Sequence, residues 1–540
     1  MKPNPWMLFA LVAAGLFTII GCGPRETPAE KAINDRVLMI NNGSEPRELD
    51  PHVVTGFPEY RVIKAILEGL VSEHPSDSND VEPGVAERWE SNEDSSVWTF
   101  YLREAQWSNG DPITAEDFVY AYRRILNPEF GAPYASMLYV MEGAQAYHEG
   151  ELEHFDEVGV KALDEHTLEI RLQGPTPHFP LMLTHYTWFP LHQPTIESFG
   201  AFARRDTGWT QPSNHVGNGP FILVEWRPNQ RITVAKNSYY WDVDQVELQA
   251  IEFYPIQDRQ TEERMFQTGQ LHKTDTVPFN SRDRYRERED PAFREDPFFA
   301  TGYIGLNLNH EVLANPKVRK ALSLAVDRDR IVERVTRSGR AAEGFVPPGI
   351  EGYPYRKHLE HDSEAARELL KEAGFPGGEG IPRLNMVVAN VDTSRTLAEV
   401  LQSMWEQELG IRVQIQNREW QVLISDMDSG NFDFFLISWV GDYLDPATFL
   451  EIFRSGDGNN RTGFASETYD QKLRDSLFLA DAEQRLRELA DVEAYLMREL
   501  PIIPVSWSHL MYLLHPAVEG WERKRLGDQP YKHLRFRQSE

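Results

Sequence analysis

The stretch that decides the fold is Phe432-Asp-Phe-Phe-Leu-Ile-Ser-Trp-Val-Gly-Asp-Tyr-Leu-Asp-Pro-Ala-Thr-Phe449, in which an apolar run ends abruptly in a tryptophan, a glycine and two acids. Phe434 to Val440 has the length and the β-branched or aromatic content of a buried strand, the kind whose carboxyl end opens on a binding crevice in α/β folds. Asp445 precedes Pro446 and a helix-forming run, so we expect its carboxylate to cap that helix by accepting backbone N–H groups. Asp442 is left without an evident local partner, and we predict that it lies at a ligand cleft.

The segments before this strand alternate between strand and helix patterns. Of these four segments, two have the residue content or the alternation of strands, and two have the apolar spacing of helices. In chain order they are a strand at Leu384–Val388, a helix at Val391–Leu409, a strand at Ile411–Gln416 and a helix at Trp420–Met427. This βαβαβ order implies a parallel sheet with the Asp442 loop at its carboxyl edge.

Length and composition are those of a large globular protein. A chain of 540 residues suggests about two to four domains, and 41% hydrophobic with 26% charged residues is typical of a folded chain. The formal net charge of −29 repels phosphate backbones, so we expect no nucleic-acid partner. The acidity is explained by solubility, or it helps to attract cationic ligands.

The sequence lacks the usual motifs of metal sites and hydrolases. Its sixteen histidines include close pairs, such as His358 with His361, but none has the spacing and glutamate of a zincin helix. No Gly-x-Ser-x-Gly elbow is present. We therefore expect no metal, no cofactor and no catalysis, and a hydrolase built on paired carboxylates is kept as the alternative from another class.

The amino terminus has the pattern of a lipoprotein signal peptide. Lys2 precedes an apolar run from Trp6 to Ile20, which has the length of a signal-peptide core, and Ile19-Ile20-Gly21-Cys22 looks like a lipobox. We predict a signal peptide over 1–22 that ends at a lipidated Cys22, followed by a flexible tether over 23–34. Cys22 is the only cysteine, which excludes an internal disulfide; the alternative is a chance cysteine after a cleaved signal. The protein is then expected to be extracytoplasmic (periplasmic or at the cell surface), lipid-anchored to the membrane.

Ten short motifs carry a family resemblance that runs in order along nearly the whole chain. They are Asn41-Asn-Gly-Ser-Glu45, Leu49-Asp-Pro-His52, Pro83-Gly-Val-Ala-Glu-Arg-Trp89, Trp98-Thr-Phe-Tyr-Leu-Arg103, Trp107-Ser-Asn-Gly-Asp-Pro-Ile-Thr-Ala-Glu-Asp-Phe-Val119, Tyr134-Ala-Ser136, Gly217-Asn-Gly-Pro-Phe221, Val318-Arg319, Asp327-Arg-Asp329 and Trp439 to Pro446. In this order they resemble extracytoplasmic solute-binding proteins of family 5, among them the oligopeptide-binding lipoproteins of ABC importers.

The resemblance implies an α/β architecture with mixed sheets. The expected fold is the two-lobed type of the periplasmic binding proteins, type II-like, with an additional domain and a ligand cleft between the lobes. The limits implied are 35–68 plus 190–275 plus 508–540 for lobe I, 69–189 for the additional domain II, and 276–507 for lobe III.

The resemblance also implies roles for individual residues around the opening stretch. In the family, the aspartate at the position of Asp442 pairs with the α-ammonium of a bound peptide; a capping or surface acid is the alternative. The backbone from Ser438 to Val440 would pair with an extended peptide as one strand pairs with another. Three aromatic residues would line side-chain pockets or else belong to the core, namely Trp439, Tyr443 and, from domain II, Tyr134.

The chain departs from oligopeptide-binding members at three charged positions. Those members carry arginines where this chain has Leu436 and Met427, and a glutamate where it has Thr55. The peptide carboxylate must then be met elsewhere, with His310 or Arg395 as candidates, unless the ligand has no conventional carboxyl terminus.

Together these features predict the substrate-binding component of a peptide ABC importer. It would act as a monomer, bind short peptides, and deliver them to the transmembrane permease subunits, with the membrane contacted by the lipid anchor only. The alternative within the same class is a family-5 receptor for another solute, such as a murein peptide, a nickel chelate or an oligosaccharide.

Overall fold

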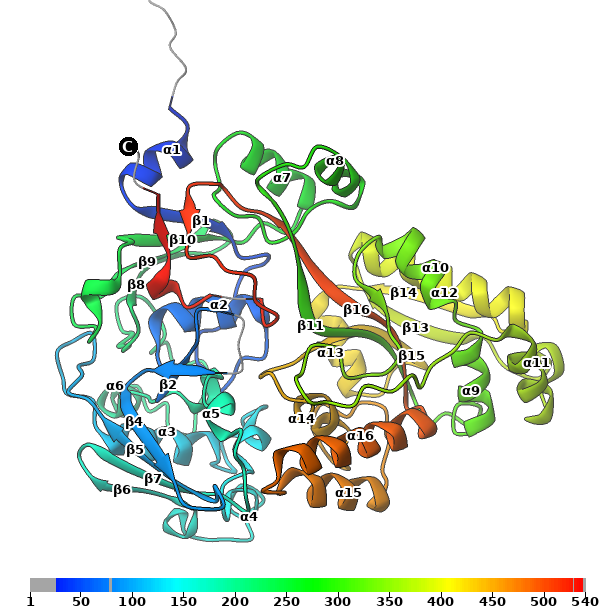
Figure 1. The fold of residues 1–540 in the computed structure, drawn as a ribbon, viewed down its shortest axis with the longest axis horizontal. Helices are drawn as coiled ribbons and strands as arrows, with labels where there is room; N and C mark the ends of the chain where they lie inside the picture. The colour runs from blue at the N-terminus through cyan, green and yellow to red at the C-terminus, as the bar shows by residue number, and fades with distance from the viewer. Residues whose placement is uncertain (1–25, 77–79, 528, 538–540) are drawn as a thin grey trace, which may run out of the picture.

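Three large sheets, each from a different part of the chain, organise the molecule (Figure 1). The structure is a computed structural model that describes residues 26–76, 80–527 and 529–537, so the predicted signal peptide and Cys22 lie outside the described residues. The sheet of lobe I has the order β1-β10-β9-β8 and is parallel only between β1 and β10. Its strands are β1 (Val37–Asn41), β10 (Ala250–Tyr254), β9 (Arg231–Lys236) and β8 (Phe221–Arg227).

Domain II is built on an antiparallel sheet that lies below lobe I in Figure 1. Its order is β4 (Ala86–Ser91), β5 (Val97–Leu102), β7 (Thr167–Arg171) and β6 (Val160–Asp164). Alternate residues of β5 are buried, so Trp98 and Phe100 face the core. Helix α3 (Ala115–Ile125) packs against β6 and begins at a capping box between Thr114 and Asp117.

Lobe III contains the predicted βαβαβ unit. Strands β13 (Leu384–Ala389), β14 (Val413–Arg418) and β15 (Phe434–Val440) are parallel and are joined by α12 (Asp392–Leu409) and α13 (Trp420–Asp428). The full sheet is ordered β12 (Arg340–Ala341), β16 (Ile502–Leu513), β11 (Phe293–Leu306), β15, β13 and β14. It is mixed because β15 pairs antiparallel with β11 on its other side. The sequence pattern predicted the parallel half of this sheet, but not the antiparallel strands that complete it.

Helices cover both faces of the lobe III sheet. Phe434 and Leu436 of β15 lie in one buried cluster and Phe435 lies in another, because successive side chains of a strand point to opposite faces. The first face is covered by α9 (Pro316–Leu324), α11 (Ser363–Glu372) and α12, and the second by α13, α14 (Ala447–Leu450), α15 (Glu467–Leu477) and α16 (Ala482–Glu499). A strand that is buried on both faces explains the uninterrupted apolar run in the sequence.

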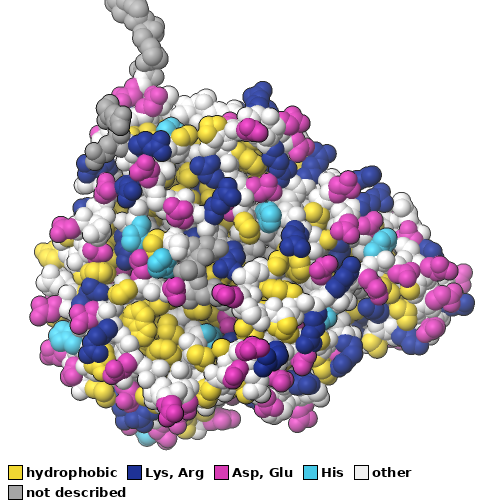
Figure 2. All heavy atoms as spheres, viewed as in Figure 1, with side chains coloured by type: hydrophobic (Ala, Val, Ile, Leu, Met, Phe, Trp, Pro, Cys, Tyr) yellow, Lys and Arg dark blue, Asp and Glu magenta, His cyan; other side chains and the backbone are white. Residues whose placement is uncertain are grey.

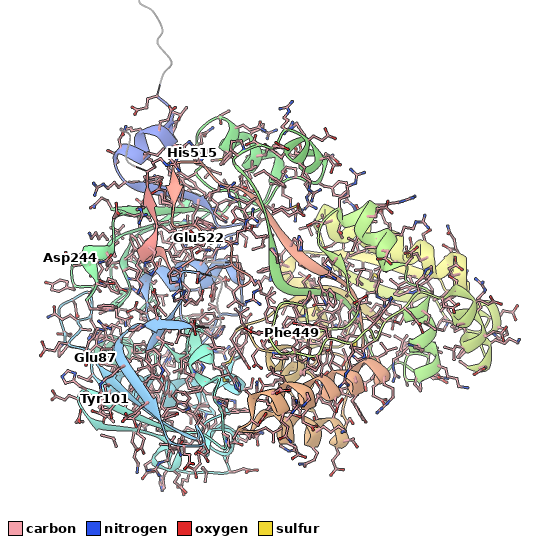
Figure 3. All side chains as sticks on the ribbon, in the orientation of Figure 1. Glu87, Tyr101, Asp244, Phe449, His515 and Glu522 are labelled. Atoms are coloured by element: carbon pink, nitrogen blue, oxygen red, sulfur yellow. The ribbon has the colours of Figure 1, made fainter. Side chains whose placement is uncertain are left out.

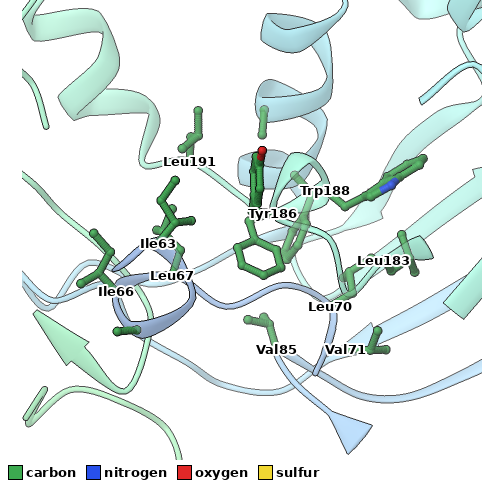
Figure 4. Packing of buried hydrophobic residues seen from close by; sticks show 14 of the residues in the cluster. Ile63, Ile66, Leu67, Leu70, Val71, Val85, Leu183, Tyr186, Trp188 and Leu191 are labelled. Atoms are coloured by element: carbon green, nitrogen blue, oxygen red, sulfur yellow. The ribbon is translucent and has the colours of Figure 1, made fainter. Parts of the chain in front are cut away.

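Lobe I and domain II share one hydrophobic core. The same cluster contains Ile251 of β10 and Phe100 of β5, which belong to different sheets. Figure 4 shows part of this core, where Ile63 and Ile66 of α2 (Phe57–Ile66) pack in the cluster that includes Trp188. The two main clusters of lobe III are separate from it, so lobe I and domain II form one packing unit and most of lobe III forms another; Tyr443 of lobe III packs in the first cluster.

The chain crosses between lobe I and lobe III as a pair of long strands. β16 (Ile502–Leu513) pairs antiparallel with β11, and the two run from lobe III toward lobe I in Figure 1. The expected limit between residues 507 and 508 falls inside β16, and the domain limits stay predictions.

The predicted tether is wrong for residues 28–34. These residues form helix α1 (Pro28–Asn34), which Thr27 caps together with Glu30. Ala29 N donates a hydrogen bond to Gly269 O (2.8 Å), and Ala29 is buried. The capping box and the contact with the folded body order a segment whose composition had indicated flexibility.

Two further findings bear on partners. Within the described ranges, no helix is both long enough and apolar enough to cross a lipid bilayer. Figure 2 shows acidic and basic side chains interspersed over the visible face, without a continuous basic stripe.

Candidate functional site

Asp442 lies where the chain leaves β15. Gly441 N donates to Phe299 O (2.8 Å) and continues the pairing with β11, whereas Asp442 N turns away to Thr448 Oγ1 (3.0 Å) at the next helix. Position 441 needs a glycine, because a Cβ there would lie 2.4 Å from the Phe299 ring and 3.0 Å from Phe449, which Figure 3 labels near the middle of the molecule. The end of the strand therefore fixes the place of the Asp442 carboxylate.

A cavity of about 210 Å³ opens in front of Asp442, between domain II and lobe III. Its walls come from residues 134–182 on one side and 439–478 on the other. Four of the predicted ligand residues line it, namely Asp442, Trp439, Tyr443 and Tyr134. The structure thus brings together residues that are about three hundred positions apart in the sequence.

The Asp442 carboxylate is desolvated and has no cationic partner among the residues that the structure describes. Burial raises its pKa to about 7; the Thr448 hydroxyl opposes this shift, and the negative charge of Glu451 adds to it. Its side chain is only 14% exposed. The nearest basic group is His185 Nε2, 3.8 Å away, but burial lowers the pKa of His185 to about 3, so the imidazole is neutral at pH 7. No lysine or arginine of the described ranges forms an ion pair with this carboxylate.

Asp445 has a stronger partner than the predicted backbone cap. Its Oδ1 does accept from Ala447 N (2.9 Å), but both carboxylate oxygens also accept from the Arg485 guanidinium, at 2.7 and 2.9 Å. Burial by itself would raise the pKa of Asp445, and the Arg485 charge outweighs it and holds the pKa at about 2. The ion pair formed because α16 brings Arg485 to this loop, which local sequence could not indicate.

Next to Asp442, one side of β15 has no neighbouring strand from the described part of the chain. β13 pairs with β15 only as far as Leu436, whereas β11 continues to Val440. In an antiparallel pair, alternate residues of β15 direct their backbone groups toward β11, and the hydrogen bond from Gly441 N to Phe299 O shows that Gly441 is one of them. The backbone N–H and C=O groups of Ser438 and Val440 therefore point to the opposite side, which β13 leaves open.

The three aromatic candidates differ in how much they contribute to the cavity. Trp439 is half-buried, and its Nε1 donates to Thr448 O (2.9 Å). Tyr443 is buried and donates its hydroxyl to Glu451 Oε2 (2.9 Å), so much of it belongs to the packing. Tyr134 lies across the cavity with its ring centroid 5.4 Å from that of His185.

His310 and Arg395 lie outside the cavity. His310 is at the opposite end of β15, where its Nε2 is 3.8 Å from Asp433 Oδ1, and Arg395 is exposed on α12. The charged residues and the histidine that line the cavity, and that the sequence did not single out, are Glu451, Arg454, Asp457, Asp470, Arg474 and His178. All but His178 follow Asp442 within 32 positions, so their nearness in sequence was the available signal.

No group of three or more histidine, cysteine or acidic residues in the described part of the chain is arranged to hold a metal ion.

Comparisons with known proteins agree with this geometry. A model of the bacterial extracellular solute-binding proteins, family 5 Middle, matches residues 80–461. The periplasmic oligopeptide-binding protein OppA of Salmonella typhimurium is 33% identical over 550 residues, which covers 97% of each chain. The crystal structure of Haemophilus influenzae OppA in complex with RPPGFSPFR is similar with a TM-score of 0.84 at 30% identity, over 93% of this chain and 99% of that one.

A second protein matches in two solved structures, of which one is an unliganded open form. The murein tripeptide binding protein MppA of Escherichia coli matches with a TM-score of 0.85 at 31% identity, over 93% of this chain and 98% of that one. Its unliganded open form matches with a TM-score of 0.68 at 30% identity, over 93% and 97%. These matches confirm the two-lobed periplasmic-binding-protein fold of type II, and this structure is less similar to the open form of MppA than to the other MppA structure.

Proposed function

Because this chain belongs to family 5 of the bacterial extracellular solute-binding proteins, we propose that it is the substrate-binding component of a peptide ABC importer. It binds short peptides outside the cytoplasmic membrane, where a lipid on Cys22 anchors it, and delivers them to the transmembrane permease subunits. It acts as a monomer without a cofactor and catalyses no reaction.

The observation that carries this proposal is the uncompensated carboxylate of Asp442. Burial makes its negative charge costly, as the raised pKa shows, and a peptide α-ammonium would offset that cost. A charge-assisted hydrogen bond in a site that excludes water is stronger than the same bond at the surface. The pocket is therefore suited to a cationic group.

The open edge of β15 supports a peptide as the carrier of that ammonium. An extended chain placed beside Ser438 and Val440 would pair with their free-facing N–H and C=O groups, as in strand addition. Such pairing recognises any peptide backbone and leaves the side chains to the cavity walls, where Trp439, Tyr443 and Tyr134 lie.

Closure of the lobes would link binding to transport. The cavity has walls on domain II and on lobe III, which belong to separate packing units, so an enclosed ligand contacts both. A ligand with better contacts in the closed form shifts the equilibrium toward it, and the permease would recognise that form.

A receptor for murein-derived peptides is the second candidate. It is favoured by the similarity to MppA, and by Arg454 and Arg474 in the cavity wall, which would suit additional carboxylates.

Native mass spectrometry of the purified protein, followed by release of what it carries, tests the proposal. We expect a mixture of short peptides that exchanges with added tri-alanine. A defined murein peptide would favour the second candidate. A purified protein that carries only a sugar or a metal chelate, and that binds no peptide in calorimetry, would refute both.

A further inference from the structure

A hydrogen bond joins lobe III to domain II at His178, one of the residues that line the cavity. Arg485, in the first turn of α16, forms the ion pair with Asp445, and its Nη2 also lies 3.0 Å from Nε2 of His178. His178 precedes the short helix α5 (Phe179–Met182) in domain II. The arrangement is one of the contacts between domain II and lobe III, and it lies beside the ligand carboxylate.

The protonation states of Arg485 and His178 decide which of the two groups donates this hydrogen bond. Burial lowers the pKa of His178 to about 3, and the Arg485 charge adds to the shift, so the imidazole is neutral at pH 7. The guanidinium can only donate, and Nε2 must therefore accept. The ring proton is then on Nδ1, which has no hydrogen-bond partner among the described residues. The imidazole is thus an acceptor for a buried cation whose charge Asp445 balances.

The same three residues hold the loop that carries Asp442. Only Tyr443 and Leu444 separate the two aspartates, and Asp445 N donates to Tyr443 O (2.8 Å) in a tight turn. The Tyr443 ring stacks on the His178 ring, with centroids 6.3 Å apart and planes at 24°. When domain II and lobe III separate, the loop loses both the hydrogen bond and the stacking.

We propose that His178, Arg485 and Asp445 form a closure latch, in which His178 is a positioning residue that holds the Asp442 loop in place once the lobes have closed. The latch rests on the proposed function, since it acts on the closed, ligand-bound form. The latch forms only when the lobes close, whereas a purely structural contact would be present in the open form as well. Loss of the latch therefore leaves the stability of the open form unchanged.

The test compares His178→Phe, which keeps a ring against Tyr443 but removes the acceptor, with His178→Gln, whose amide oxygen restores an acceptor near the Nε2 position. His166→Phe is the matched control, because His166 is exposed on the same domain. Peptide Kd and dissociation rate are measured with tri-alanine and with RPPGFSPFR. Melting temperature and radius of gyration are measured with and without peptide.

For His178→Phe we expect a roughly tenfold to hundredfold higher Kd, almost all of it from faster dissociation, since a charge-assisted hydrogen bond is lost from the closed form. The melting temperature without peptide should match the wild type, and His178→Gln should recover most of the affinity. An unchanged Kd in His178→Phe overturns the latch. A melting temperature of His178→Phe that falls by the same amount without peptide as with peptide also overturns the latch.

Failure of the proposed function would look different. If the wild-type protein binds neither tri-alanine nor RPPGFSPFR, the proposed function is overturned. The latch is then tested by the radius of gyration, which scattering measures. In that case a larger radius of gyration in His178→Phe than in the wild type and the His166→Phe control supports the latch, and equal radii overturn it.

Discussion

Replacement of Asp442 by asparagine removes the charge at the end of β15 while it keeps the size of the side chain. Loss of one partner of a desolvated charge pair costs about 2–5 kcal/mol of binding free energy, which is roughly a 30-fold to several-thousand-fold increase in Kd. We expect this loss for peptides with a free α-ammonium at pH 7.5. N-acetylated peptides have no such charge, so their Kd should change far less.

The wild-type affinity should also depend on pH in a direction that the structure fixes. In the closed site without a ligand, burial raises the pKa of the carboxyl group to about 7, and only its ionised form pairs with an ammonium, so protonation competes with binding as the pH falls. Each pH unit below 7 then raises Kd about tenfold, or about 100-fold at pH 5. Above about pH 8 the peptide amine itself loses its proton, so the tightest binding should be near pH 7.5.

Isothermal titration calorimetry between pH 5 and pH 9 measures both effects. Asp475→Asn is the control, because Asp475 is an exposed acid of the same lobe. The acid limb, which is the rise of Kd below pH 7, should be absent in Asp442→Asn. In the Asp475→Asn control it should equal that of the wild type. An equal loss for free-amine and acetylated peptides, or an acid limb that persists in Asp442→Asn, would refute the ammonium pocket.

Three predictions concern stability. Asp442→Asn should shift the open–closed equilibrium of the unliganded protein toward the closed form at pH 8, by up to about 4 kcal/mol, and not at pH 3.5, since burial penalises the carboxylate only when it is ionised; a radius of gyration without peptide that equals the wild type at pH 8 would contradict this. Gly441→Ala should cost about 1–3 kcal/mol and weaken peptide binding, because its Cβ would meet the Phe299 ring, whereas Gly458→Ala, with open space around it, should change neither. Arg124→Met should cost about 3–5 kcal/mol in urea denaturation, because it leaves Asp50 buried without its partner at 2.6 Å; a loss below 1 kcal/mol would show that Asp50 finds another partner.

Local pattern predicted the elements of lobe III closely. The apolar run of β15 and the helical spacing before it gave the βαβαβ order, because each element must bury its own apolar residues and so leaves a periodic trace in the sequence. The same reasoning failed for residues 28–34, where one capping box and a contact with Gly269 decide the structure.

The sequence by itself determined that Asp442 follows a buried strand and has no local partner. Only the tertiary structure decided what surrounds it, namely a cavity with a second wall from domain II, a pKa near 7, and the nearby pairing of Asp445 with Arg485 and His178. Strand and helix patterns arise from neighbours within a few positions. Desolvation and charge pairing depend on which distant segments pack together, so His310 and Arg395, chosen for their charge, lie elsewhere while His178 lies in the site.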